Sequence, residues 1–168
     1  MAPIPSFTIR NATRADIRPL VEIWYVGWQS AHAKILPESL ARFRTRESFE
    51  ERLGILLPSV RVAGDANEPV GFCITKDDEL YQLYIAEQAR GSGVAAALAA
   101  DAERVMAAQG VGLAWLACAI GNDRAARFYE KQGWHRAGIV VNHLDTPEGD
   151  FPLEVWRYEK QLERPAIA

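Results

Sequence analysis

Two glycines stand where the sequence predicts that a strand passes into a helix. The segment 88–95 (QARGSGVA) follows a predicted strand that ends at Ile85 and precedes a predicted Ala-rich helix at 94–108. Glycine permits a positive φ and lets a ligand approach the main chain closely. The first turn of a helix adds unpaired N–H groups and the positive end of the helix dipole. The segment therefore predicts an anion site suited to phosphate or pyrophosphate, with a plain tight turn as the alternative.

The loop does not match the two common nucleotide-binding signatures. It lacks the Gly-x-x-x-x-Gly-Lys-Ser/Thr pattern of nucleotide triphosphatases. It also fails the Gly-x-Gly-x-x-Gly pattern, because Ala96 occupies the position of the third glycine. No acidic residue closes a second strand about 20 residues later, as a dinucleotide fold requires. The rest of the chain must therefore decide which phosphate is bound.

The loop must be positioned by the elements on either side of it. The strands at 80–85 and 112–118 are joined by the helix at 94–108, and such a crossover makes them parallel. Short turns between the earlier strands predict antiparallel neighbours. The sequence thus predicts an α+β fold with about seven mostly antiparallel strands, a central parallel pair and four helices. The other predicted elements are strands at 7–10, 60–63, 70–75, 134–141 and 152–159 and helices at 16–34, 37–56 and 122–132.

Composition excludes several classes of partner. The 168 residues predict a single domain over 1–168. The net charge of −3 gives no basic excess for nucleic acid or an anionic membrane, and no apolar run is long enough to span a bilayer. Cys73 and Cys118 lie in apolar runs, which predicts buried thiols and a reducing cytoplasm. Residues 1–5 lack the basic start and apolar core of a secretory signal.

Two separated motifs resemble the signature of the GCN5-related N-acetyltransferase (GNAT) family. Gln-x-x-Gly-x-Gly at 88–93, preceded by Glu-Leu-Tyr-x-Leu-Tyr-Ile at 79–85, is similar to its acetyl-coenzyme A motif. Asn-x-x-Ala-x-x-Phe-Tyr-Glu-Lys-x-Gly-Trp at 122–134 is similar to the second half. The order of elements fits from Phe7 to Leu162. The resemblance implies the acyl-CoA N-acyltransferase fold, in which the two central parallel strands splay apart.

The resemblance also implies acetyl-CoA as the acyl donor. Leu83 and Ile85 would offer main-chain groups to the pantetheine arm, and the pyrophosphate would bind main-chain N–H groups at 90–95. Arg90 would add positive charge unless it is only a solvated arginine, and Asn122 would bind pantetheine unless it only caps its helix. The expected donor contacts are Leu83, Tyr84, Ile85, Gln88, Arg90, Gly91, Ser92, Gly93, Val94, Ala95, Asn122, Ala125, Phe128 and Tyr129.

The implied reaction is direct transfer of the acetyl group from the thioester to a primary amine. The amine must lose a proton before it attacks, and Glu79 is the first candidate for that base, with Asp78 and Tyr81 weaker. The Ile85 N–H would stabilise the oxyanion. Tyr129 would protonate the leaving thiolate. A solvent-facing glutamate and a tyrosine that only packs are the alternatives to these roles.

Covalent and metal-assisted chemistry are disfavoured. An acyl-cysteine at Cys118 would need a neighbour that lowers the thiol pKa, and no histidine is adjacent in sequence. The three histidines, His32, His135 and His143, do not have the spacing of metal ligands, so no metal is predicted.

The sequence does not identify the acceptor amine. Trp28, His32 and Tyr81 are the predicted substrate-binding residues, and the first two can share one helix face at i and i+4. An acidic loop at 145–150 beside these aromatic groups favours a small cationic amine or a peptide amine. The competing interpretation is a non-catalytic acyl-CoA binding or sensing module of the same fold. The last strands could also join a partner's sheet edge, which leaves a homodimer open.

Overall fold

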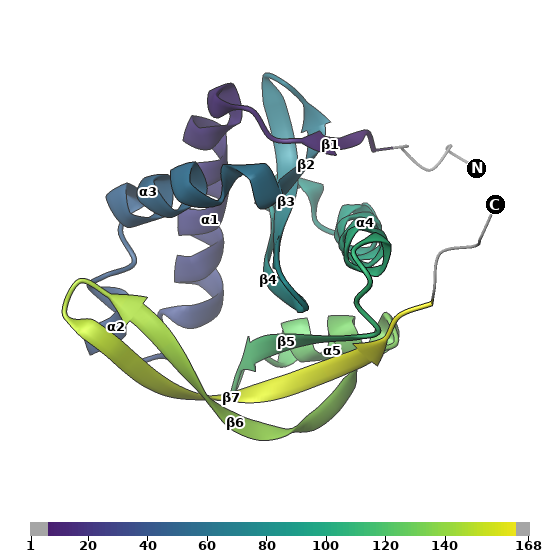
Figure 1. Ribbon diagram of the computed structural model, residues 1–168. Coiled ribbons are helices and arrows are strands. Elements are labelled where there is room, and N and C mark those ends of the chain that lie inside the picture. Colours follow the sequence, from purple (N-terminus) through teal and green to yellow (C-terminus); the bar gives the residue numbers. More distant parts are fainter. Residues whose placement is uncertain (1–6, 164–168) are drawn as a thin grey trace.

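The chain folds around one seven-stranded sheet with the strand order β1-β2-β3-β4-β5-β7-β6 (Figure 1). The computed structural model describes residues 7–163, so the expectation for residues 1–5 lies outside the described residues. The strands are β1 (Ile9–Asn11), β2 (Val60–Asp65), β3 (Glu68–Lys76), β4 (Glu79–Ile85), β5 (Leu113–Ala119), β6 (His135–Thr146) and β7 (Gly149–Gln161). The helices are α1 (Ile17–His32), α2 (Glu38–Ala41), α3 (Arg46–Leu56), α4 (Val94–Ala108) and α5 (Asp123–Lys131).

Helices cover both faces of the sheet and enclose two apolar clusters. On one face, α1 and α3 pack through side chains such as Trp24 and Phe49 against β2 and β3. On the other face, α4 and α5 pack through side chains such as Leu98 and Ala126. Figure 1 shows α1 and α3 on the opposite side of β3 and β4 from α4. A ligand that passes between β4 and β5 would therefore meet one helix pair on each face.

The central parallel pair separates almost as soon as it forms. β4 and β5 share one register pair, Glu79 with Trp115, whereas β5 and β7 pair along the whole length of β5. The predicted mostly antiparallel sheet with a splayed central pair is thus confirmed. The divergence leaves one edge of β4 without a strand partner over most of its length.

The number of helices differs from the prediction by one. Residues 37–56 form two helices, α2 and α3, where one was expected. Thr45 and Ser48 form a capping box, in which the Ser48 N–H donates to Thr45 Oγ1 at 3.1 Å and the Thr45 N–H donates to Ser48 Oγ at 3.1 Å. Such a box starts a new helix and satisfies its free donors. The segment between the two helices consequently turns, and it carries Arg44.

The last hairpin is longer than predicted. The expected polar loop at 145–150 is paired strand up to Thr146 and Gly149, and only a two-residue turn remains. Its tip reaches α2 (Figure 1), where Arg42 Nη2 lies 2.6 Å from Glu148 Oε2. β6 lies at an edge of the sheet and exposes Ile139 and Val141. Within residues 7–163, no helix combines the length and the apolar character needed to cross a membrane.

Two helical glycines give a matched test of packing. A Cβ added at Gly27 on α1 would lie 2.5 Å from Cδ1 of Tyr84, whereas one added at Gly54 on α3 would meet nothing within 4 Å. We expect Gly27→Ala to lower the free energy of unfolding by about 1–3 kcal/mol through overpacking. We expect Gly54→Ala to raise it by about 0.5–1 kcal/mol through helix propensity. Urea unfolding of both variants checks this, and equal effects would contradict the close approach of α1 to Tyr84.

Candidate active site

A cavity of about 550 Å³ lies where β4 and β5 separate. It extends from α1 and the segment before α3, across β4, to the N-terminal ends of α4 and α5. Residues of the last two strands complete the wall. The predicted site residues that line it are Glu79, Tyr81, Leu83, Tyr84, Ile85, Arg90, Gly91, Gly93, Val94, Ala95, Asn122, Ala125, Phe128, Tyr129, Trp28 and His32.

The free edge of β4 presents backbone groups to this cavity. The Ala86 N–H donates to Val70 O at 2.8 Å, so this pair is bonded across β3 and β4. Bonded and non-bonded pairs alternate along an antiparallel ladder. Leu83 and Ile85, three and one positions earlier, therefore turn their N–H and C=O groups away from β3. These groups face the opening beside β5, as the sequence-based hypothesis for both residues requires.

A bulge in β4 distributes its side chains between the two faces. Leu80 pairs with Thr75 and Gln82 with Ile74, so Tyr81 is an extra residue without a register partner. Tyr81 then packs on the α1 and α3 side together with Tyr84, while Leu83 lies on the α4 side. Bulges re-aim side chains next to functional sites. Here the bulge turns two tyrosines toward one half of the cavity.

The glycine loop has the conformation that its composition predicts. Gly91 has φ 76° and Gly93 has φ 89°, both in the left-handed region, and Gly93 is the N-cap of α4. A Cβ at either position would meet no protein atom within 4 Å. The glycines are therefore required by backbone conformation within the protein itself. They expose the first turn of a 15-residue helix, whose N–H groups favour an anion.

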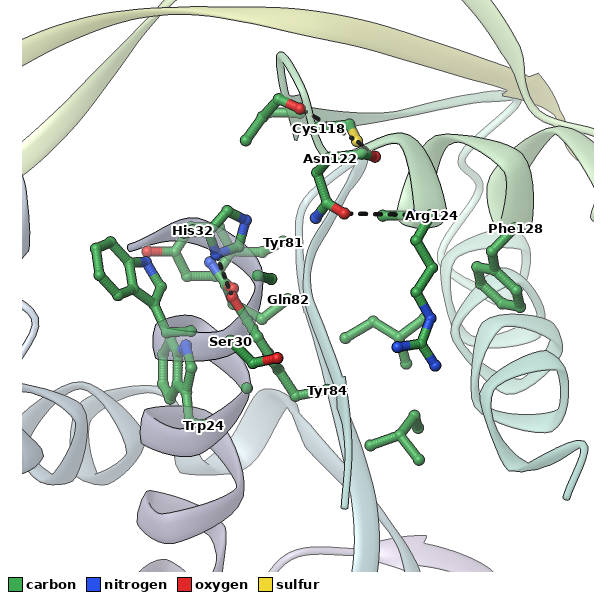
Figure 2. Close-up of a pocket in the computed structure, with 18 of the residues that line it drawn as sticks. Trp24, Ser30, His32, Tyr81, Gln82, Tyr84, Cys118, Asn122, Arg124 and Phe128 are labelled. Atoms are coloured by element: carbon green, nitrogen blue, oxygen red, sulfur yellow. Dashed lines mark hydrogen bonds between the residues drawn. The ribbon is translucent and has the colours of Figure 1, made fainter. Parts of the chain in front are cut away.

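Three polar side chains surround the mouth beside this loop. Arg90 and Arg124 are both exposed and both line the cavity. Figure 2 shows Arg124 extending from the start of α5 into the opening between α5 and β4. Asn122 caps α5, because its Oδ1 accepts from the Ala125 N–H at 3.3 Å, and this leaves its amide NH₂ free for a ligand. The mouth is therefore cationic and rich in donors.

Two of the expected donor contacts are not brought to the cavity. Gln88 is exposed outside the lining. The Ser92 hydroxyl donates to the carbonyl of Ala89, and its backbone N–H lies 3.3 Å from the same carbonyl. Both residues instead belong to the short 3₁₀ turn and the bend that lead into Gly93. Their role in this structure is to shape the loop.

Glu79 lies at the point where the two central strands part. Glu79 lines the cavity, and burial raises the pKa of its carboxyl group to about 7 against the opposing effect of Lys76. A carboxylate with a pKa near neutrality is suited to accept a proton at that pH. The weaker candidate Asp78 lies outside the lining, and its Oδ1 accepts from Trp115 Nε1 at 3.0 Å. Of the two neighbouring carboxylates, only that of Glu79 therefore belongs to a residue that lines the cavity.

Tyr129 lies on α5 with its ring against Trp134 and Tyr158. It lines the cavity, and among residues 7–163 no side chain forms a hydrogen bond with its hydroxyl. Burial raises its pKa far above the ordinary value of a phenol. The group is consequently a protonated donor over the physiological range. A tyrosine that merely packs would be expected to satisfy its hydroxyl locally.

The cysteines are both free and buried, as predicted. Cys118 lines the cavity, but burial raises the pKa of its thiol to about 11. Burial raises the pKa of Cys73 to about 12. Thiols with such pKa values are poor nucleophiles near neutral pH. Within the described part of the chain, no cluster of His, Cys, Asp and Glu side chains could hold a metal ion.

The far half of the cavity is aromatic. Trp28 and His32 lie on one face of α1, with ring centroids 5.6 Å apart, and Tyr84 Oη lies 3.4 Å from His32 Nδ1. Figure 2 shows His32 and Tyr84 directed toward each other above Trp24. Burial, with Arg44, lowers the His32 pKa to about 4. His32 is therefore neutral at pH 7 and acts as a hydrogen-bonding group.

Three arginines that line the cavity, Arg44, Arg52 and Arg124, were missed from the sequence, and the acidic loop lies outside the cavity. Arg44 and Arg52 line the aromatic half. Of the acidic residues at 145–150, Glu148 pairs with Arg42 and Asp150 pairs with His143, and none lines the cavity. The interpretation that acidic side chains face the acceptor is therefore not supported. Neither residue belongs to a sequence motif; α3 packs against α1, and this places Arg52 beside Trp24 and Tyr81.

Known proteins share this architecture. The model of the acetyltransferase (GNAT) family matches residues 20–134. A GCN5-related N-acetyltransferase from Rhodopseudomonas palustris is 20% identical with a TM-score of 0.74, over 96% of this chain and 99% of that one. PaiA N-acetyltransferase from Thermoplasma acidophilum, solved with coenzyme A, is 22% identical with a TM-score of 0.64, over 94% and 99%.

A further structure extends the likeness. YncA from Salmonella typhimurium, solved with its cofactor acetyl-CoA, is 16% identical with a TM-score of 0.65, over 98% of both chains. At such identities, the likeness establishes the fold. No curated protein matches the sequence. Because the family model covers more than half of its residues, the chain belongs to the acetyltransferase (GNAT) family.

Proposed function

We propose that the protein is an acetyl-CoA-dependent N-acetyltransferase that transfers the acetyl group directly to a primary amine of a small molecule or peptide. One observation carries the proposal: β4 and β5 part after a single register pair and leave free backbone groups at a cavity. That cavity joins a helix N-terminus on one side of the sheet to an aromatic recess on the other. Membership of the family supports acetyl transfer as the chemistry.

The donor half of the cavity offers free backbone groups and positive charge to coenzyme A. Leu83 and Ile85 would pair with the amides of an extended pantetheine arm, as a further strand pairs with a sheet edge. The N–H groups after Gly93 would bind the diphosphate, and Arg90 and Arg124 would neutralise its charge. The structures of PaiA and YncA, which contain coenzyme A and acetyl-CoA respectively, support this choice of donor.

Three groups of the chain would carry out the transfer. Acetyl-CoA supplies an activated thioester carbonyl. Glu79 accepts a proton from the acceptor ammonium, directly or through water, so that the neutral amine attacks. The Ile85 N–H donates to the carbonyl oxygen as negative charge develops on it. The Tyr129 hydroxyl donates its proton toward the departing thiolate sulfur, and Asn122 holds the pantetheine beside it.

Calorimetry on the wild-type protein tests the donor. We expect saturable binding of acetyl-CoA and no binding of ATP or NAD at the same concentrations, because the loop lacks both nucleotide signatures. Release of free thiol is then assayed with polyamines, amino acids, aminoglycosides and peptide N-termini. Binding without thiol release for any amine would favour the alternative, a non-catalytic acyl-CoA binding or sensing module. Preference for ATP or NAD would contradict the proposal.

We further propose a single N-acetyltransferase domain over residues 1–168, a cytoplasmic location and a homodimer. The exposed edge strand β6, with Ile139 and Val141 on its surface, is the feature that supports pairing with a second copy. Exposed, unpaired strand edges favour such association.

A further inference from the structure

The cavity carries an excess of guanidinium groups. Arg44, Arg52, Arg90 and Arg124 line it, and Glu79 is the one carboxylate among the described lining residues. None of the four arginines forms an ion pair with a carboxylate within residues 7–163. The arginines that do pair with carboxylates lie elsewhere on the protein and are Arg10, Arg42, Arg46, Arg61, Arg104, Arg136 and Arg157. The chain, whose net charge is −3, thus directs its acidic side chains away from the cavity.

Arg44 is the most deeply buried of these four arginines. Its side chain is buried, with 7% of the residue exposed, in the segment between α2 and α3. No carboxylate among the described residues compensates it, and burial together with the charge of Arg52 lowers its pKa. A buried, uncompensated charge is costly to a folded protein. A ligand of opposite charge would compensate it.

Arg52 is fixed beside Arg44 by aromatic neighbours. Its guanidinium carbon lies 4.5 Å from the centre of the Trp24 ring, and its Nη2 donates to the Tyr81 hydroxyl. Stacking on an aromatic face orients a guanidinium and leaves its edge free for hydrogen bonds. Lys76 Nζ lies 4.6 Å from the Tyr81 ring and adds positive charge nearby. The aromatic half of the cavity is therefore a preorganised cationic recess.

The two arginine pairs serve different halves of the cavity. Arg90 and Arg124 stand near the start of α4 and in α5, on the face where the phosphates of coenzyme A would bind. Arg52 packs on the opposite face, with the cluster of α1 and α3, and Arg44 shares its electrostatic neighbours Tyr81 and Tyr84. One donor molecule that spans the loop and the splay would leave this second pair unused.

From this arrangement we propose that Arg44 and Arg52 form an anion-recognition subsite, and that the acceptor is a primary amine carrying a carboxylate or phosphate group. The proposal rests on the proposed N-acetyltransferase function and specifies its substrate class. Paired guanidinium groups recognise planar or tetrahedral oxyanions through several charged hydrogen bonds. Glu79, at the splay, would then receive the ammonium end of the same molecule. The acceptor would be zwitterionic, as amino acids and aminoalkyl phosphates are.

Binding to matched ligand pairs tests the subsite. Calorimetric titrations use the twenty standard amino acids against their carboxamides, and 2-aminoethyl phosphate against 2-aminoethanol, with and without coenzyme A. We expect at least one member that carries the carboxylate or phosphate to bind about ten times or more tighter than the partner that lacks this group. The two series show whether carboxylate or phosphate is preferred. If no anionic member binds more tightly than its partner, the proposal is overturned.

Variants of two nearby arginines distinguish a role of Arg44 in binding the anionic ligand from a role in stabilising the fold. Arg44→Met should weaken binding of the preferred anionic ligand by roughly 10- to 100-fold and raise the Tm of the ligand-free protein, since it removes an uncompensated buried charge. Arg42→Met, at an exposed position two residues away, should change neither property appreciably. Arg44→Lys should restore part of the affinity. A fall in Tm for Arg44→Met, with ligand preference intact, would show a structural role and contradict the subsite.

The outcome distinguishes failure of this inference from failure of the proposed function. Acetyl-CoA binding and thiol release are measured on the wild-type protein in the same buffers. If acetyl-CoA binds and amines without a carboxylate or phosphate are acetylated in preference to those that carry one, only the acceptor class is wrong. If acetyl-CoA does not bind, the proposed function fails, while titrations without coenzyme A still decide whether Arg44 and Arg52 bind anions.

Discussion

Replacing Glu79 with glutamine is expected to lower kcat/KM for the acceptor by roughly 10²–10⁴, the usual contribution of a general base. Glutamine keeps the shape of the side chain and its place at the start of β4 but cannot accept the proton. The affinity for acetyl-CoA should stay close to that of the wild type, because Glu79 lies at the strand divergence and not at the glycine loop. An equal loss of acetyl-CoA affinity would contradict a role confined to proton transfer.

The pH dependence of kcat/KM in the wild type and in Glu79→Gln is an independent test of Glu79 as the base. The Glu79 pKa is raised from 4.5 to about 7, mainly by burial. The base works only when deprotonated, so wild-type kcat/KM should rise with pH and level off above about 7. The variant should show no such inflection in its residual rate. A wild-type profile that is flat between pH 6 and 8 would exclude Glu79 as the base.

The Glu79→Gln substitution should stabilise the folded protein at high pH, although it lowers the activity. A carboxyl group whose pKa is raised on folding favours the folded state below pH 4.5, and this contribution is lost as pH rises through about 7. Above pH 7 the folded wild type must hold a buried charge, whereas Glu79→Gln holds none. The Tm of the variant relative to the wild type should therefore increase from pH 5 to pH 8. A general disruption of the fold would lower the Tm at both pH values.

Asp78→Asn is the matched control. Asp78 is adjacent in sequence, but its carboxylate binds Trp115 Nε1 outside the cavity. The variant should keep most of its turnover. Because the Asp78 charge contributes to the raised pKa of Glu79, its removal should shift the pH profile slightly toward lower pH.

Segments with a complete local signal were predictable from the sequence. The left-handed glycine before α4, the Asn122 cap of α5 and the parallel crossover between them depend on residues close together in the chain. Hydrophobic pattern and turn residues therefore sufficed to predict both elements and their order. The elements that carry the donor half of the candidate site were accordingly predicted in the correct order, while the roles of their residues stay predictions.

Features that depend on distant partners could not be predicted in this way. The bulge at Tyr81 exists only in the register between β3 and β4, and the last hairpin extends past its predicted end because its polar residues pair across strands. The break between α2 and α3 is different, because it follows from the local capping box of Thr45 and Ser48, which the predicted helix at 37–56 overlooked. Arg44 lies in the resulting break. The charge of the acceptor half was therefore misjudged, since it follows from tertiary packing.

Tyr129→Phe is the second substitution with a large expected effect, a fall in kcat of roughly 10²–10³ with acetyl-CoA affinity nearly unchanged. The ring of Tyr129 packs against Trp134 and Tyr158, and phenylalanine preserves those contacts. The lost hydroxyl forms no hydrogen bond with a side chain of residues 7–163, so the Tm should change little. An unchanged kcat would show that another group protonates the thiolate.

Tyr158→Phe serves as the control for this substitution because it removes a hydroxyl from the same aromatic cluster. The Tyr158 hydroxyl accepts from Arg136 at 2.9 Å and donates to Glu130 at 3.2 Å, and the residue does not line the cavity. Its loss should lower the Tm and leave kcat per folded molecule intact. Opposite profiles for the two variants, one losing turnover and the other stability, would assign proton donation to Tyr129. Loss of stability in both would instead make Tyr129 a packing residue and favour the non-catalytic module.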